Sequence, residues 1–188
     1  MQELDRLRQD CSVRQKKGIH FIISSVVIWL AVMFVHLLDI PILTKNLYTF
    51  CCTAPLLPLA YLVSKVMKID FEGKGNPLTK LGILFSLNQM LYLLIAMWVY
   101  PTMPEKMVMV IAIIFGAHLL PYGWLYRSKS YYVVAVIAPF LALGLGLFMK
   151  PFVVAAAFAL LEMLFTVALL IENRLQSSQR EDDAFDRC

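Results

Sequence analysis

The stretch PFVVAAAFALLEMLFTVALLI, residues 151–171, is the part of the chain that decides the fold. Coiled as an α-helix rising 1.5 Å per residue, it is long enough to cross a hydrocarbon core of roughly 30 Å. It carries one ionisable side chain, Glu162, close to its middle. A carboxyl group at that depth is unfavourable unless it is protonated, hydrated or paired, so it usually faces a bundle interior or a cavity. The stretch therefore predicts a membrane-spanning helix with one polar point inside the protein.

The same apolar pattern recurs along most of the chain. Hydrophobic residues make up 60% of the sequence, and the mean hydropathy of +0.72 is far above that of a soluble domain. Lipid leaves no backbone polar group unpaired, and the runs lack the alternation of barrel strands, so helices are the only structure that fits. The sequence predicts an all-α fold, a polytopic integral membrane bundle of six transmembrane helices at 18–38, 47–67, 79–100, 105–126, 130–149 and 151–171.

The basic residues predict how this bundle is oriented. Fourteen of the seventeen Lys and Arg residues fall on one side of the predicted membrane, and the other three are Lys45, Lys106 and Lys150. This positive-inside bias places both termini in the cytoplasm. The net charge of +4 is then a topology signal and does not indicate nucleic-acid binding. We expect three regions, a basic cytoplasmic segment at 1–17, a transmembrane domain at 18–171 and a cytoplasmic tail at 172–188.

The helices also show signs of a partial internal duplication. The repeating unit is a two-helix hairpin, and six helices would form three such hairpins. A shift of about 64 residues places Ser24-Ser25 on Asn88-Gln89 and Pro58 on Pro121. Proline kinks are expected in the second, fourth and fifth spans, the last at Pro139. Spans five and six are separated only by Lys150, so we expect one or both of them to be shorter, with an end near Gly146.

A stripe of small residues in span five predicts a close helix contact. Ala138, Ala142 and Gly146 recur every four residues. Such spacing lets two membrane helices approach closely. We expect span six to be the partner.

Four polar residues are the candidate ligand-binding residues. Asn88 and Gln89 lie at the same membrane depth as Glu162, and His118 lies slightly to the cytoplasmic side of the midplane. A neutral acid with amides and an imidazole nearby could bind or relay a proton or a cation. Each residue also has a structural interpretation, because interhelical hydrogen bonds commonly use the same side chains. Both interpretations remain open at this stage.

The chain carries no familiar catalytic, metal or cofactor motif. The four cysteines form no C-x-x-C pair, and His36 with Asp39 would supply only two metal ligands. No nucleophile motif, phosphate-binding loop or dinucleotide fingerprint occurs. We therefore predict no catalytic residues, no metal and no cofactor.

Several segments of the chain resemble a family of small bacterial integral membrane proteins classed as a domain of unknown function. The resemblance covers nearly the whole chain and rests on the segments at 76–82, 88–98, 104–110, 116–122, 124–126 and 128–131. It implies a multi-pass protein of the bacterial cytoplasmic (inner) membrane. It implies no activity, ligand or catalytic residue.

The sequence thus favours a small transporter or channel-like protein that handles a proton, a cation or a small polar solute at a central polar cluster. Two alternatives remain, an intramembrane lipid-modifying enzyme with His118 and Glu162 as acid and base, and a non-catalytic membrane sensor or scaffold. The expected partners are membrane lipids and a small ion or polar solute, and not nucleic acid. A homo-oligomer is compatible with the sequence.

Overall fold

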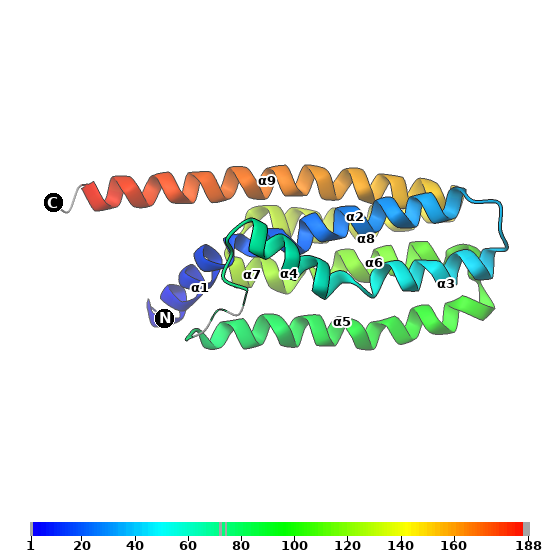
Figure 1. The fold of residues 1–188 in the computed structure, drawn as a ribbon, viewed down its shortest axis with the longest axis horizontal. Helices are drawn as coiled ribbons and strands as arrows, with labels where there is room; N and C mark the ends of the chain where they lie inside the picture. The colour runs from blue at the N-terminus through cyan, green and yellow to red at the C-terminus, as the bar shows by residue number, and fades with distance from the viewer. Residues whose placement is uncertain (1, 72, 74, 186–188) are drawn as a thin grey trace.

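The computed structural model describes residues 2–71, 73 and 75–185, which form a bundle of helices (Figure 1). In chain order the elements are α1 (Gln2–Arg14), the short 3₁₀ helix η1 (Lys16–Gly18), α2 (Ile19–Leu37), α3 (Ile42–Thr53), α4 (Leu56–Val66), α5 (Pro77–Thr102), the 3₁₀ helix η2 (Pro104–Lys106), α6 (Met107–His118), α7 (Leu120–Tyr126), α8 (Lys129–Phe148) and α9 (Pro151–Phe185). The all-α prediction is confirmed for these residues.

The helices run along the long axis of the molecule, and α1 and the end of α9 lie at the same end (Figure 1). Among the described residues, five helical segments are long and apolar enough to cross a membrane, at Lys16–Leu37, Pro77–Thr102, Pro104–Tyr126, Lys129–Phe148 and Pro151–Ser178. The pair α3 and α4 passes the same test as one segment bent by 40°. Because α2 ends at one end of the bundle and α5 starts at the other, α3 and α4 together carry the chain back along its length (Figure 1).

Proline breaks two of these passes at corresponding places. α3 ends at Thr53 and α4 begins at Leu56, on either side of Pro55. In the next hairpin α6 ends at His118 and α7 begins at Leu120, with Pro121 in its first turn. Proline cannot donate the backbone hydrogen bond that would continue a helix. The two breaks agree with the proposed duplication, which itself stays a prediction.

The small-residue stripe of α8 packs against α6, and our choice of span six as its close partner was wrong. A Cβ atom built on Gly146 would lie 2.3 Å from Cγ of Met109 in α6. A Cβ atom built on Gly116 of α6 would lie 2.7 Å from Cβ of Ala138. The absence of these Cβ atoms allows the two backbones to approach closely. α9 instead packs most extensively against α2.

Span five ends at Phe148, one residue before its predicted end at 149 and two residues beyond Gly146. α8 continues to Phe148 and α9 begins at Pro151, so two residues make the connection. The Lys106 ammonium donates hydrogen bonds to the carbonyl oxygens of Gly146 and Leu147, at 2.7 and 3.1 Å. The last carbonyl groups of a helix lack partners within the helix, and Lys106 supplies one from η2.

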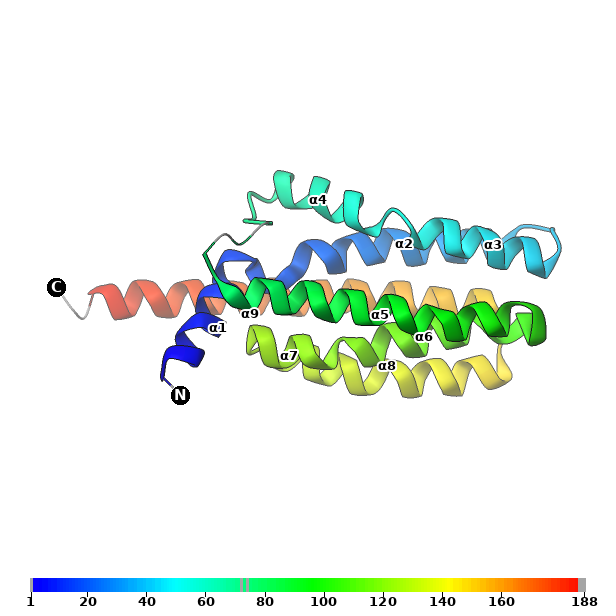
Figure 2. The same ribbon diagram turned by 90° about the horizontal axis from the view of Figure 1, so that it is seen from below.

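The peripheral helix of the bundle is α5, which lies along its outside (Figure 2). Figure 1 places α5 and α9 on opposite sides of the molecule. The start of α5 follows the sequence signal at Asn76 and Pro77, because the Asn76 side chain accepts a hydrogen bond from the Leu78 amide at 2.9 Å. This cap is typical of helix N-termini.

Candidate functional site

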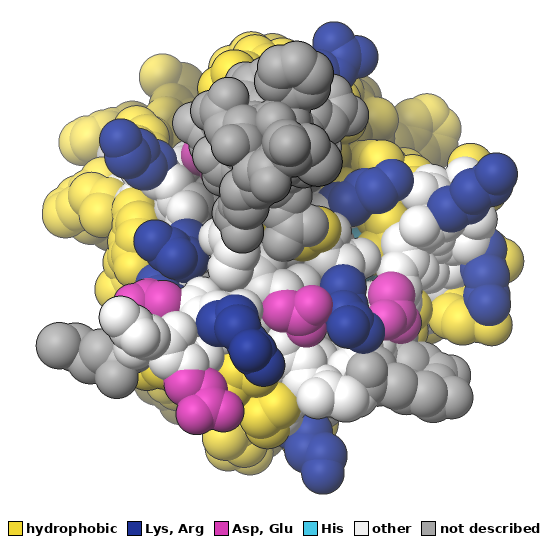
Figure 3. Space-filling model, turned by 90° about the vertical axis from the view of Figure 1, so that its left-hand side faces the viewer, with side chains coloured by type: hydrophobic (Ala, Val, Ile, Leu, Met, Phe, Trp, Pro, Cys, Tyr) yellow, Lys and Arg dark blue, Asp and Glu magenta, His cyan; other side chains and the backbone are white. Residues whose placement is uncertain are grey.

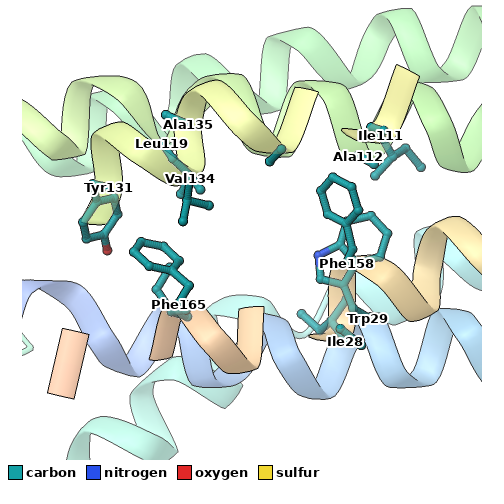
Figure 4. Packing of buried hydrophobic residues seen from close by; sticks show 14 of the residues in the cluster. Ile28, Trp29, Ile111, Ala112, Leu119, Tyr131, Val134, Ala135, Phe158 and Phe165 are labelled. Carbon is teal, nitrogen blue, oxygen red and sulfur yellow. The ribbon is translucent and has the colours of Figure 1, made fainter. Parts of the chain in front are cut away.

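Glu162 is completely buried in the middle of α9. Phe158 and Phe165 lie one turn before and after it on the same face of the helix, and both are buried. The Phe158 ring contacts Trp29 and the Phe165 ring contacts Tyr131, each with 4.8 Å between ring centroids (Figure 4). Aromatic contacts therefore enclose the carboxyl group along the helix in both directions.

The carboxyl group of Glu162 has one hydrogen-bond partner among the described residues, the hydroxyl group of Ser25 in α2. Ser25 Oγ lies 2.6 Å from Glu162 Oε2 and 2.8 Å from the carbonyl oxygen of Ile22. One hydroxyl proton cannot fully satisfy both acceptors. A protonated Glu162 would donate a hydrogen bond to Ser25 Oγ, and the Ser25 hydroxyl could then donate to the Ile22 carbonyl oxygen. Both hydrogen bonds can therefore form when Glu162 is neutral, but not when it is a carboxylate.

The second oxygen of Glu162, Oε1, is buried without a partner in the described structure. An unpaired buried acceptor costs about 1–3 kcal/mol. Such an atom usually indicates a strained or functional position, or a water or ion that completes the site. Glu162 therefore keeps its place as the leading candidate residue.

Asn88 and Gln89 do not join Glu162, contrary to the central cluster that we expected. Asn88 is exposed on α5, where its Nδ2 donates to the Tyr92 hydroxyl group at 3.0 Å, and Gln89 is half-buried. α5 lies on the side of the bundle opposite α9 (Figure 1). Asn88 and Gln89 were predicted to lie at the same membrane depth as Glu162, but they lie on a different side of the bundle.

His118 is half-buried at the end of α6 and also stays apart from Glu162. Its Nδ1 is hydrogen-bonded to the carbonyl oxygen of Phe115, and its ring contacts those of Phe115 and Tyr122. No hydrogen bond in the described part of the chain joins His118 to Glu162. The acid–base pair of the enzyme hypothesis is therefore not assembled. Ligand binding by any of the four predicted residues stays a prediction.

The structure reveals a polar strip on α2 that the sequence analysis did not assign to the site. Besides Ser25, it includes Ser24, whose hydroxyl donates to the His20 carbonyl oxygen at 2.8 Å. His20 is 1% exposed, and its Nδ1 has no partner among the described residues. The only sequence signal for this strip was the polar pair Ser24-Ser25, which we had used as evidence for the duplication.

A second polar network lies where the chain enters the bundle. Lys17 Nζ and Glu172 Oε2 form an ion pair at 2.8 Å, and the Ser130 amide and hydroxyl groups donate to Glu172 Oε1. The Tyr131 hydroxyl group donates to the Lys17 carbonyl oxygen at 2.9 Å. The network fastens η1 to α8 and α9, at the end of the bundle that carries α1.

The Cys11 thiol is buried and protonated, and the described residues contain no cluster that could hold a metal ion. Burial, reinforced by the negative charge of Asp10, raises the pKa of the Cys11 thiol to about 11, so this thiol stays protonated at neutral pH. His36 Nε2 lies 3.0 Å from the Thr49 hydroxyl group. No three His, Cys, Asp or Glu residues among those described lie close enough together to hold a metal ion.

The chain was also compared with known proteins. The model of a family of unknown function, DUF7010, matches residues 4–172. The chain belongs to this family. The resemblance to an uncharacterised family is therefore confirmed over nearly the whole bundle, and the family assigns no activity. Neither the curated proteins nor the solved structures contain a significant match.

Proposed function

We propose that this chain is a six-span protein of the bacterial cytoplasmic membrane with both termini in the cytoplasm. Two observations support the orientation. α1 and the end of α9 lie at one end of the bundle (Figure 1), and charged side chains gather on that end (Figure 3). Basic residues collect on the cytoplasmic side of membrane proteins. The sixth span is the bent pair α3 and α4.

We further propose that the protein handles a proton or a small cation at Glu162. The observation that carries this proposal is the buried, unpartnered Oε1 of that residue. Ser25 holds the other oxygen, so the site has one fixed side and one vacant acceptor. Loss of the acid proton would leave a carboxylate that needs a cation or water, because a buried unpaired charge is very unfavourable. The ligand-binding pair is then Glu162 and Ser25.

Replacement of Glu162 by glutamine tests this proposal. Glutamine keeps the shape of the side chain and a hydrogen bond to Ser25 but cannot titrate. Wild-type protein in liposomes should pass protons down an imposed pH gradient, and Glu162→Gln should abolish that flux without lowering thermal stability. Equal proton flux through the two proteins, including none through either, would refute the proposal.

The second candidate is a non-catalytic membrane scaffold in which Glu162 only fastens α9 to α2. The close aromatic packing on both sides of Glu162 favours it. In this case Glu162→Leu should be the damaging change, because it leaves Ser25 facing a side chain that cannot hydrogen-bond. The small-residue stripe of α8 is already covered by α6, so it offers little surface for assembly with another protein.

A further inference from the structure

A cavity of about 620 Å³ opens at the end of the molecule that carries α1, and Glu162 is not among the residues that line it (Figure 1). Three separate elements build it: α1, the connection that precedes α5, and the C-terminal end of α7. The residues that line it are mostly charged, namely Asp5, Arg6, Leu7, Gln9, Asp10, Arg14, Gly75 and Arg127.

Both carboxyl groups of the cavity already have protein partners. Asp5 accepts from Arg8 at 3.2 Å, and Asp10 accepts from Arg14 at 2.8 Å and from the Asn76 side chain at 3.0 Å. Within the described part of the chain, Arg6 and Arg127 are exposed and form no ion pair. The cavity therefore presents two guanidinium groups whose charge the protein does not neutralise by direct pairing.

Arg8, also in α1, differs from Arg6 in that its guanidinium group makes structural contacts. Its Nη2 and Nε donate to the Trp124 carbonyl oxygen at 2.6 and 2.9 Å, and its guanidinium group lies 4.5 Å from the centre of the Trp124 ring. These contacts fix α1 against α7. Arg8 thus holds the cavity wall in place, whereas Arg6 makes no comparable contact with any other described residue.

Arg127 occupies a backbone position at which arginine is unexpected. It follows α7 in the left-handed region, with φ 52° and ψ 42°. The residue that follows a helix in this left-handed conformation is usually glycine, because a Cβ atom makes the conformation unfavourable. Non-glycine residues held in this conformation often belong to binding sites. The guanidinium group of Arg127 lines the cavity.

We propose that this cavity binds a phosphate group between Arg6 and Arg127. Guanidinium groups pair with phosphate oxygens through two parallel hydrogen bonds and remain charged at all physiological pH values. At the basic end of a membrane bundle, the phosphate could belong to an anionic lipid headgroup or to a soluble phosphate ester. The site does not depend on the role proposed for Glu162.

Two variants remove the guanidinium groups with little risk to the fold. Arg127→Gly places the preferred residue at the end of α7, so the protein without ligand should be as stable as the wild type or more stable. Arg6→Ala puts a good helix former at an exposed position of α1. Arg174→Ala is the matched control, because Arg174 is exposed in α9 and does not line the cavity.

The test measures the thermal unfolding of the purified full-length protein in neutral detergent. The added probes are short-chain phosphatidylglycerol, glycerol 3-phosphate and, as the zwitterionic control, short-chain phosphatidylcholine. A ligand that binds the folded state raises the unfolding temperature. We expect at least one of the two anionic probes to stabilise the wild type. Arg6→Ala and Arg127→Gly should each lose about 10- to 100-fold in affinity, as for removal of a charge-assisted hydrogen bond, and Arg174→Ala should behave as the wild type.

The two anionic probes identify the source of the phosphate. Stabilisation by both means that the phosphate group suffices, and stabilisation by the lipid alone means a headgroup bound together with its chains. The proposal is overturned if neither anionic probe stabilises the wild type. It is also overturned if the two cavity variants respond as the wild type does, or if Arg174→Ala loses as much affinity as they do.

Discussion

Ser25 is the residue whose hydroxyl group contacts one of the two carboxyl oxygens of Glu162, Oε2. It comes from α2, more than a hundred residues away along the chain, and its neighbour Ser24 bonds only within its own helix. Adjacent residues on a helix point about 100° apart, so one of the two serines can face α9 while the other faces elsewhere. The two serines therefore form a natural pair for comparison.

Ser25→Ala should lower the free energy of unfolding by about 1–3 kcal/mol, because it leaves both oxygens of Glu162 without a protein partner. Ser24→Ala removes only a bond to the preceding turn, so its effect should stay within about 0.5 kcal/mol. Reversible denaturant unfolding in detergent micelles would compare the two variants. Equal effects would mean that the Ser25–Glu162 contact contributes nothing to stability.

At the scale of the elements, the contact between α6 and α8 depends on where the glycines lie. Gly146 faces Met109 at a distance that leaves no room for a methyl group, whereas a methyl group on Gly144 would meet nothing within 4 Å. Both glycines lie in the same helix, two residues apart. They share a helix but not a face.

Gly144→Ala should stabilise the protein by up to about 1 kcal/mol, because alanine loses less backbone entropy than glycine in a helix. Gly146→Ala should destabilise it by about 1–3 kcal/mol, because α6 must shift to accept the new methyl group. The thermal midpoints of the two variants should therefore move in opposite directions. A rise for both would mean that α6 and α8 are not as close as described.

At the scale of the whole molecule, the bent pair α3 and α4 determines whether the chain crosses the membrane five or six times. If the pair crosses, reporter fusions after Gly75 and after the C-terminus should both report cytoplasm. Fusions after Asp39 and after Met149 should report the opposite side. Asp39 and Gly75 on the same side would show that α3 and α4 form a re-entrant segment instead.

Hydropathy determines which features of this fold could be predicted from the sequence and which could not. Hydropathy gives the depth of each residue in the membrane, so the helix positions and the buried Glu162 could be predicted. It does not give the direction in which a helix faces, so Asn88 could not be separated from Glu162 nor Ser25 matched to it. The small-residue stripe of α8 could be recognised from the sequence. Its partner, α6, could not, because the partner depends on which helix packs beside α8 in the folded bundle. Side-by-side placement of helices is decided by packing between segments distant in sequence.

The length of α9 has a mechanical consequence. This helix continues to Phe185 and projects beyond the other helices (Figure 1). Its 35 residues span about 50 Å, well beyond the roughly 30 Å of a hydrocarbon core. The part of α9 that carries Glu162 is packed against α2, whereas its C-terminal part extends past the other helices. A small tilt of the packed part of α9 produces a larger displacement at its C-terminal end. A change around Glu162 can therefore be transmitted to a partner bound at that end.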